Sequence, residues 1–283
     1  MHDRTETMPI KQEDVPRADG MPVLGLGTWQ NDDHEQCVES VRRALELGYR
    51  HVDTAQIYRN EAAVGDAIER ASVPREDVFL ATKVWIRNLS RQGVLASTEE
   101  SLERLGTDYL DLLYVHWPAG AYDPAETFAA FDELHEKKII RHVGVSNFEP
   151  EHVEQAREHL DAPVFANQVE MHPFLPQTEL REYAQASGIE LVAYSPLARG
   201  DVLGNETLAE IADRHEATEA QVALAWLRAK GVTAIPKATS EAHIRENWES
   251  LSLELGTDEI EAIDGLSIRK RKVQPGFAPE SWE

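Results

Sequence analysis

The sequence is poor in cysteine and in long apolar runs. Its 283 residues include one cysteine, Cys37, which excludes an intrachain disulfide and a cysteine-based metal cluster. Cys37 shares an apolar helical stripe with Val38, Val41 and Leu45, so we expect a buried, inert thiol. No apolar stretch approaches the roughly 18 residues that a membrane span needs. The first fifteen residues are polar and lack the apolar core of a secretory signal, so we expect a cytoplasmic protein without a membrane partner.

Basic residues are also scarce. The chain has 28 basic and 51 acidic residues, a net charge of −23, and only eight of the basic residues are lysine. A surface this acidic repels nucleic acids and anionic membranes, which argues against a nucleic-acid-binding protein. Because concentrated salt would screen the self-repulsion, we hypothesise a salt-loving source with an acidic, halophile-like surface.

Short apolar runs alternate with amphipathic stretches along the chain. Most of the runs lack a polar alternation, as is typical of strands buried on both faces of a parallel sheet. We expect strands at 23–27, 51–55, 78–84, 110–117, 142–147, 164–171, 189–197 and 232–238. Helical patterns lie at 32–48, 91–106, 146–160, 207–217, 218–231 and 257–265.

This alternation indicates an α/β fold, a closed (β/α)8 TIM barrel that forms a single domain over 1–283. The rival fold is an open doubly wound sheet, whose nucleotide site usually follows the first strand as G-x-G-x-x-G. Here that turn reads LGLGTWQND, without a third glycine, which favours the barrel. The turn at Ala18-Asp19-Gly20 predicts an N-terminal β-hairpin that plugs the lower end of the barrel. The aperiodic C-terminal tail is expected to fold over the barrel mouth, with Phe277 or Trp282 as a lid.

Several expected strands end on a residue that can do chemistry. In such barrels, the site lies at the carboxyl ends of the strands. Each residue alone has a simpler interpretation, such as a helix cap, a surface lysine or a core histidine, but a ring of them indicates a polar site. The residues are Asp53, Lys83, His116, Asn147, Gln168, Tyr194 and Lys237.

A proton relay can be built from these residue types. A phenol has a pKa near 10, and a nearby ammonium lowers that pKa by favouring the phenolate. Asp53 and Lys83 end neighbouring strands, and Tyr58 lies in the loop just after Asp53. His116, one strand further, could orient a carbonyl oxygen. No side chain supplies a hydride, so this chemistry requires a cofactor.

The sequence resembles the aldo-keto reductase family. The segment DTAQIYRNEAAVG (53–65) looks like the family's signature after the second strand, and six motifs follow in the family's order: ATKVW (81–85), LYVHWP (113–118), GVSNF (144–148), NQVEMHP (167–173), AYSPL (193–197) and IPKATS (235–240). The resemblance implies that aldehydes and ketones are reduced to alcohols, with Tyr58 as the general acid. It implies that Lys83, paired with Asp53, tunes Tyr58 and that His116 steers the carbonyl.

The resemblance also implies NADPH as the cofactor, without a Rossmann fold. Ser146, Asn147 and Gln168 would hold the carboxamide, Tyr194 would stack on the nicotinamide, and Ser195, Pro196 and Leu197 would pass beneath the pyrophosphate. The remaining expected cofactor contacts are Thr28, Trp29, Lys237, Thr239, Ser240, His243, Glu246 and Asn247.

The expected pocket for the 2′-phosphate departs from the family pattern. His243 stands where the family commonly has arginine, and a neutral imidazole cannot make the forked contact of a guanidinium. Because Lys237 keeps its charge, we expect NADPH to be the better cofactor and NADH to be accepted.

We expect the substrate pocket to be aromatic. Trp29, Trp85 and Trp117 each follow a strand end, and with His116 they should contact the substrate. Such a cleft suits small carbonyls, dicarbonyls or keto-sugars.

The run Arg269 to Lys272 could bind an acidic group, although a solvated charge cluster is the simpler interpretation. We expect a monomer or a weak homo-oligomer, and no bound metal.

Two alternatives use the same fold. A redox-sensing regulatory subunit would bind the nicotinamide nucleotide, but the complete set of Asp53, Tyr58, Lys83 and His116 argues against a purely sensory role. A metal-dependent or Schiff-base lyase could use Lys83 or Lys237 as its amine. The sequence lacks a cluster of ligands at metal-binding spacing, which disfavours the metal version.

Overall fold

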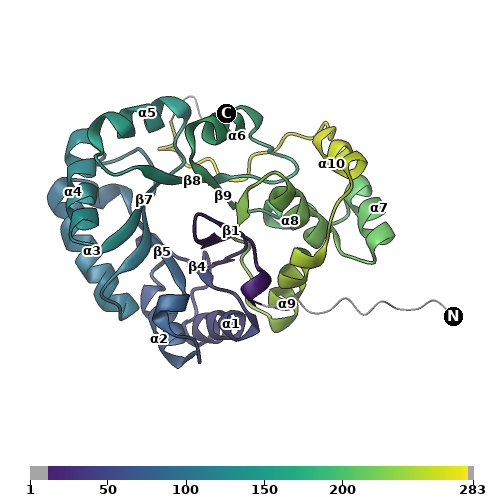
Figure 1. The fold of residues 1–283 in the computed structure, drawn as a ribbon, viewed down its shortest axis with the longest axis horizontal. Helices are drawn as coiled ribbons and strands as arrows, with labels where there is room; N and C mark the ends of the chain where they lie inside the picture. The colour runs from purple at the N-terminus through teal and green to yellow at the C-terminus, as the bar shows by residue number, and fades with distance from the viewer. Residues whose placement is uncertain (1–11, 280–283) are drawn as a thin grey trace.

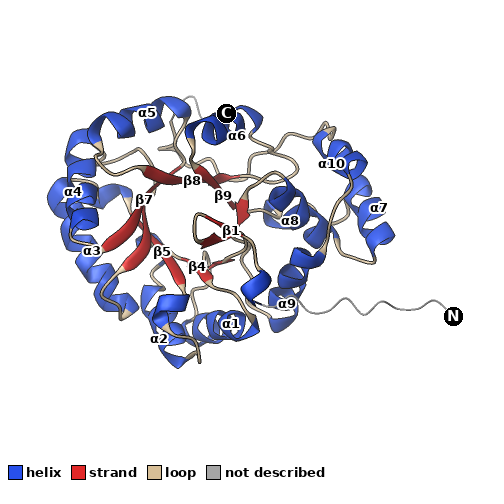
Figure 2. Cartoon of the chain, viewed as in Figure 1, coloured by secondary structure: helices blue, strands red, loops and turns tan. Residues whose placement is uncertain are grey.

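The computed structural model describes residues 12–279, and helices surround a strongly curled sheet (Figures 1 and 2). The eight strands of this sheet are parallel and lie in the order β10-β9-β8-β7-β6-β5-β4-β3. Their bounds are β3 Leu26–Gly27, β4 His51–Asp53, β5 Phe79–Val84, β6 Leu110–Val115, β7 Ile140–Ser146, β8 Val164–Glu170, β9 Glu190–Tyr194 and β10 Thr233–Ala234.

The α-helices follow the strands and cover the outside of the sheet (Figure 2). They are α1 His34–Leu47, α2 Glu61–Arg70, α3 Arg91–Leu105, α4 Pro124–Glu136, α5 Pro150–His159, α6 Thr178–Ser187, α7 Glu206–His215, α8 Glu219–Ala229, α9 Glu241–Glu249 and α10 Thr257–Asp264. None of the described helices is long and apolar enough to cross a membrane.

Local signals fix several of these bounds. Asp33 caps α1 by accepting a hydrogen bond from the Gln36 backbone N–H, and α1 ends at Gly48, whose φ of 133° suits glycine. The helical pattern expected from residue 146 begins only at Pro150, a residue that first turns accept. The prediction was wrong by one turn at that end, because Ser146 still belongs to β7.

The prediction of a last strand over 232–238 is mostly wrong. Only Thr233–Ala234 forms a strand, followed by an isolated bridge between Gly27 and Lys237. Pro236 has no N–H to donate, so a regular ladder cannot continue through it. Its carbonyl still accepts a hydrogen bond from the Gly27 N–H at 3.1 Å.

The predicted N-terminal hairpin is present. β1 (Arg17–Ala18) pairs with β2 (Met21–Pro22) across Asp19 and Gly20, both of which have positive φ, as a tight hairpin turn requires. Met21 is fully buried in a small apolar cluster on the concave face of the sheet, with Phe79, Ala81, Leu112, Tyr114, Ala166, Val192 and Ile235. The hairpin therefore fills the inside of the curl, and Figure 1 shows it there.

The alternation of side chains along each strand decides what faces inward. Phe79 and Ala81 of β5 lie in the inner cluster, and Lys83 follows them with the same period of two. Leu112 and Tyr114 of β6 point the same way, and His116 continues their row. The inner apolar layer thus gives way to a polar layer at the carboxyl ends of the strands.

Candidate active site

A buried ion pair lies at the base of this polar layer. The Lys83 ammonium donates hydrogen bonds to Asp53 Oδ1 and, at 2.8 Å, to the Thr54 carbonyl. Gln168 Nε2 donates to Asp53 Oδ2 at 2.7 Å. Burial lowers the pKa of Lys83, and the Asp53 carboxylate opposes that shift. Because both charges are paired and hydrogen bonded, burying them costs far less than burying either alone.

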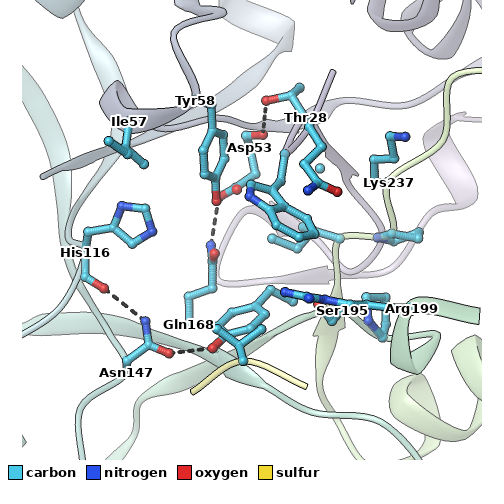
Figure 3. Close-up of a pocket in the computed structure, with 18 of the residues that line it drawn as sticks. Thr28, Asp53, Ile57, Tyr58, His116, Asn147, Gln168, Ser195, Arg199 and Lys237 are labelled. Carbon is cyan, nitrogen blue, oxygen red and sulfur yellow. Dashed lines mark hydrogen bonds between the residues drawn. The ribbon is translucent and has the colours of Figure 1, made fainter. Parts of the chain in front are cut away.

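Tyr58 lies directly above this pair. It ends the 3-10 helix Gln56–Tyr58, and the Lys83 ammonium lies 5.1 Å from the centroid of its ring. The Tyr58 and His116 rings meet edge to face with centroids 5.9 Å apart. Figure 3 shows both side chains pointing into the same open space.

The pKa of Tyr58 shifts in the direction opposite to the one expected from Lys83. Burial raises it well above its usual value, and the Asp53 carboxylate adds to the rise. The same desolvation acts on His116, whose pKa is held well below its usual value by burial and then by Lys83. At neutral pH the site therefore presents a protonated phenol beside a neutral imidazole.

The residues expected to hold a carboxamide are hydrogen bonded to one another. Ser146 Oγ donates to the Gln168 carbonyl at 2.8 Å, and Asn147 Nδ2 donates to Ser146 Oγ and to the His116 carbonyl, each at 3.0 Å. The Tyr194 hydroxyl donates to Asn147 Oδ1 at 2.8 Å. These contacts hold Asn147 in the left-handed region, with a φ of 62°.

A pocket of about 570 Å³ opens above these groups. Its lining contains most of the predicted residues: Thr28, Trp29, Asp53, Tyr58, Trp85, His116, Trp117, Asn147, Gln168, Tyr194, Ser195, Pro196, Leu197 and Lys237. Lys83 and Ser146 lie behind this surface, with at most 1% of either residue exposed.

The residues after Lys237 do not line the pocket. Thr239, Ser240 and His243 lie at the N-terminal end of α9, where Ser240 caps the helix by accepting a hydrogen bond from the His243 backbone N–H. Glu246 and Asn247 lie further along α9, and Asn247 is buried. The structure thus places His243, Glu246 and Asn247 in α9, Ser240 at its cap and Thr239 just before the cap.

Arg199 lines the pocket and was missed by the sequence analysis. Its guanidinium stacks over the exposed Trp29 ring, 4.5 Å from the ring centroid. The loop that carries it is tightly turned, since Ser195, Ala198 and Arg199 all have positive φ. The available signal was an arginine in the loop after the seventh strand, where barrels often bind phosphate.

The C-terminal tail forms one wall of the pocket through Val273, Pro275 and Phe277. The Phe277 ring meets Trp85 and Trp117 edge to face, with centroids 5.7 and 5.6 Å away. The other lid candidate, Trp282, lies outside the described residues. This end of the pocket is therefore aromatic.

The two ends of the pocket differ in chemistry. The end at Tyr58 and His116 carries the groups that can act on a carbonyl. The other end carries two cations, Arg199 and Lys237, beside the turned loop that begins at Ser195 (Figure 3). An elongated, anionic cofactor whose reactive part lies near Tyr58 fits this arrangement.

Comparison with known proteins gives a consistent result. The sequence profile of the Aldo/keto reductase family matches residues 23–268. A glyoxal reductase of Bacillus subtilis is 42% identical over 251 residues, which cover 89% of this chain and 91% of that protein. The 9,11-endoperoxide prostaglandin H2 reductase of Trypanosoma cruzi is 41% identical over 254 residues, 89% of each chain. The solved aldose reductase of Schistosoma japonicum is 31% identical, with a TM-score of 0.88 over 92% of this chain and 95% of that one.

Proposed function

The chain belongs to the aldo/keto reductase family, and we propose that it is an NAD(P)H-dependent reductase of small aldehydes, ketones and dicarbonyls. The observation that carries the proposal is the shared position of Tyr58 and His116 on the pocket, with the Lys83–Asp53 pair buried beneath them.

In this proposal Tyr58 donates the proton to the carbonyl oxygen. Its raised pKa keeps the phenol protonated until the oxygen gains charge. The phenolate that forms then lies above the Lys83 ammonium, whose charge stabilises it. Asp53 keeps Lys83 charged and in place. The neutral His116 imidazole donates a hydrogen bond to the same carbonyl oxygen and orients it.

The cofactor would lie along the pocket from Tyr194 to Lys237. We propose that Asn147 and Gln168 hold its carboxamide, that Tyr194 packs on its ring, and that Ser195 to Leu197 support its diphosphate. A bound nicotinamide would supply the hydride that reduces the carbonyl carbon. Arg199 and Lys237 would neutralise its phosphates.

We expect a reduced preference for NADPH over NADH. Lys237 and Arg199 favour the additional phosphate, but His243, an exposed residue of α9, lacks the forked guanidinium of an arginine. The ratio of kcat/KM values for the two cofactors should stay below about a thousandfold, or about 4 kcal/mol. His243→Arg should raise that ratio. A larger wild-type ratio would contradict this prediction.

The substrate class follows from the aromatic end of the pocket. Trp85, Trp117 and Phe277 surround the space beside His116 and favour small or flat apolar carbonyl compounds. The similarity to a glyoxal reductase makes small dicarbonyls the first compounds to test.

The test is a panel of aldehydes, ketones and dicarbonyls with wild type and Tyr58→Phe. The variant should bind NADPH normally, as measured by fluorescence titration, because the aromatic ring is retained and only its hydroxyl is lost. Turnover should fall by at least about a hundredfold, the usual contribution of a positioned acid. Tyr183→Phe, on α6 and outside the pocket lining, removes the same hydroxyl and serves as the matched control. Near-normal turnover by Tyr58→Phe would reject the mechanism, and stoichiometric NADPH oxidation by wild type would indicate a sensor.

We also propose that the curled sheet closes into a (β/α)8 barrel and that residues 1–283 form one cytoplasmic domain. Two isolated parallel bridges, Leu24 with Ala234 and Gly27 with Lys237, support closure. The Gly25 N–H donates to the Ala234 carbonyl, and the Ala234 N–H donates to the Val23 carbonyl, each at 2.9 Å.

A further inference from the structure

The basic run from Arg269 to Lys272 binds an acidic side chain of the same protein, Asp201. The ammonium groups of Lys270 and Lys272 both donate to the same oxygen of Asp201, Oδ2. These hydrogen bonds lower the pKa of Asp201 to about 2, so the carboxylate stays charged at physiological pH. The run therefore makes a specific contact with an acidic residue of another segment, although this contact is partly exposed to solvent.

A second anchor fixes the backbone of the same run. Glu170, at the end of β8, is fully buried, and its two carboxylate oxygens accept the backbone N–H groups of Lys272 at 2.6 Å and Val273 at 2.8 Å. His172 Nε2 lies 2.9 Å from Glu170 Oε1 and holds the carboxylate in place. The Lys270 N–H adds a hydrogen bond of 2.9 Å to the Phe174 carbonyl.

These anchors join two walls of the pocket. Asp201 directly follows Arg199 and Gly200, which line the cofactor end. Residues 269–277, here called the tail strap, continue from the anchors to Phe277. That residue contacts Trp85 after β5 and Trp117 after β6, so the tail strap crosses the pocket from the β8 and β9 side.

We propose that two positioning residues hold the tail strap: Asp201 couples it to the loop 195–203, and Glu170 fixes its backbone at the end of β8, so that the cofactor wall and the substrate wall move together. The functional consequence rests on the proposed reductase activity, whereas the coupling itself does not. Neither residue contacts the reacting atoms; each acts through the segment that it holds.

The two anchors should respond differently to salt. Lys270 and Asp201 are 53% and 32% exposed, so molar salt, with a screening length of about 3 Å, weakens their attraction. The Glu170 contacts are buried and direct, and they should persist. Wild type in molar salt should therefore resemble Asp201→Asn in dilute buffer.

The experiment measures hydrogen–deuterium exchange in the full chain, where no turnover is needed. The reporting amides are those of Asp201 and Leu203 in the loop and of Lys272 and Val273 in the tail strap, all of which donate known hydrogen bonds. The variants are Asp201→Asn and Glu170→Gln, with Asp201→Glu as the conservative rescue. Glu133→Gln is the matched control, because Glu133 also bridges two cations, Arg91 and Lys137, but lies on α4.

Asp201→Asn should accelerate exchange in both segments by about threefold to fivefold, the size expected for an exposed ion pair. Glu170→Gln should accelerate the tail strap by at least about tenfold, because charge-assisted hydrogen bonds are lost, and should also accelerate the loop. With a carbonyl substrate and NADPH, both variants should raise both KM values and leave kcat within about twofold. Asp201→Glu should restore wild-type behaviour.

Acceleration confined to one segment, or equal to that of Glu133→Gln, would overturn the coupling even if Glu170→Gln folds poorly, since Asp201→Asn tests it alone. Coupled exchange in a protein without reductase turnover would uphold the coupling and reject only the proposed function.

Discussion

At the scale of single residues, burial controls the ionisation of two histidines. His51, inside the curl, is fully buried, and burial lowers its pKa to about 4. His116 shifts in the same direction. A histidine whose pKa is lower in the folded state binds its proton mainly in the unfolded chain, so it destabilises the fold as pH falls below its unfolded pKa.

We therefore expect the free energy of unfolding to fall between about pH 6.5 and pH 4, by up to about 1.4 kcal/mol per pH unit for each such imidazole. Urea unfolding at several pH values measures this slope. His51→Gln should have a shallower slope than wild type, and the exposed His159→Gln should match wild type. A slope that His51→Gln leaves unchanged would contradict this explanation.

The residue types predicted which side chains meet at the site, but they did not predict the direction of the pKa shift of Tyr58. Asp53, Tyr58, Lys83 and His116 converge as expected, because each strand directs alternate side chains to one face. The direction of the pKa shift of Tyr58 was not predictable, since it depends on how much water the surrounding side chains exclude.

At the scale of the element, caps determine where helices begin. Thr218 accepts a hydrogen bond from the Gln221 N–H, and the Gln221 side chain accepts one from the Thr218 N–H, which forms a capping box on α8. The Gln221 amide also donates to the Glu246 carbonyl of α9. This cap therefore links two neighbouring helices.

Thr218→Ala should lower the free energy of unfolding by about 1 kcal/mol. The Gln221 N–H loses its acceptor, the Thr218 hydroxyl, and the reciprocal hydrogen bond from the Thr218 N–H to the Gln221 side chain is weakened. Thr178→Ala is a suitable control, because Thr178 is exposed at the start of α6 and Gln177 occupies the cap. Urea unfolding of both variants measures the difference. Equal stability of the two variants would show that the capping box contributes little.

Strand ends and the tail were harder to predict than the helices. Apolar runs extend beyond several strands, as at 232–238, because buried loops need the same residue types as strands. The tail strap has no periodicity. Its backbone contact is also distant in sequence: Glu170 accepts a hydrogen bond from the Lys272 N–H, which lies 102 residues later in the chain. No local pattern in the sequence could pair them.

At the scale of the whole molecule, the net negative charge makes the stability of the fold depend on salt. With a net charge of −23, self-repulsion opposes the compact state, and added salt screens it. We expect the melting temperature to rise as potassium chloride increases from dilute buffer to molar concentration. Scanning calorimetry measures this, with an equal concentration of a neutral osmolyte as the control. A melting temperature that is flat or falling would reject the hypothesis of a salt-adapted surface.

The opposite placement of the N-terminal hairpin and the tail strap has a practical consequence for handling the protein. A purification tag or a solid support attached after Phe277 would lie close to the aromatic wall of the pocket, which Phe277 forms, and would hinder access to it. Attachment ahead of the hairpin joins the chain at the other end of the curl, where Met21 is buried in the inner apolar cluster. Oriented immobilisation for a biocatalytic reactor should therefore use the amino-terminal side.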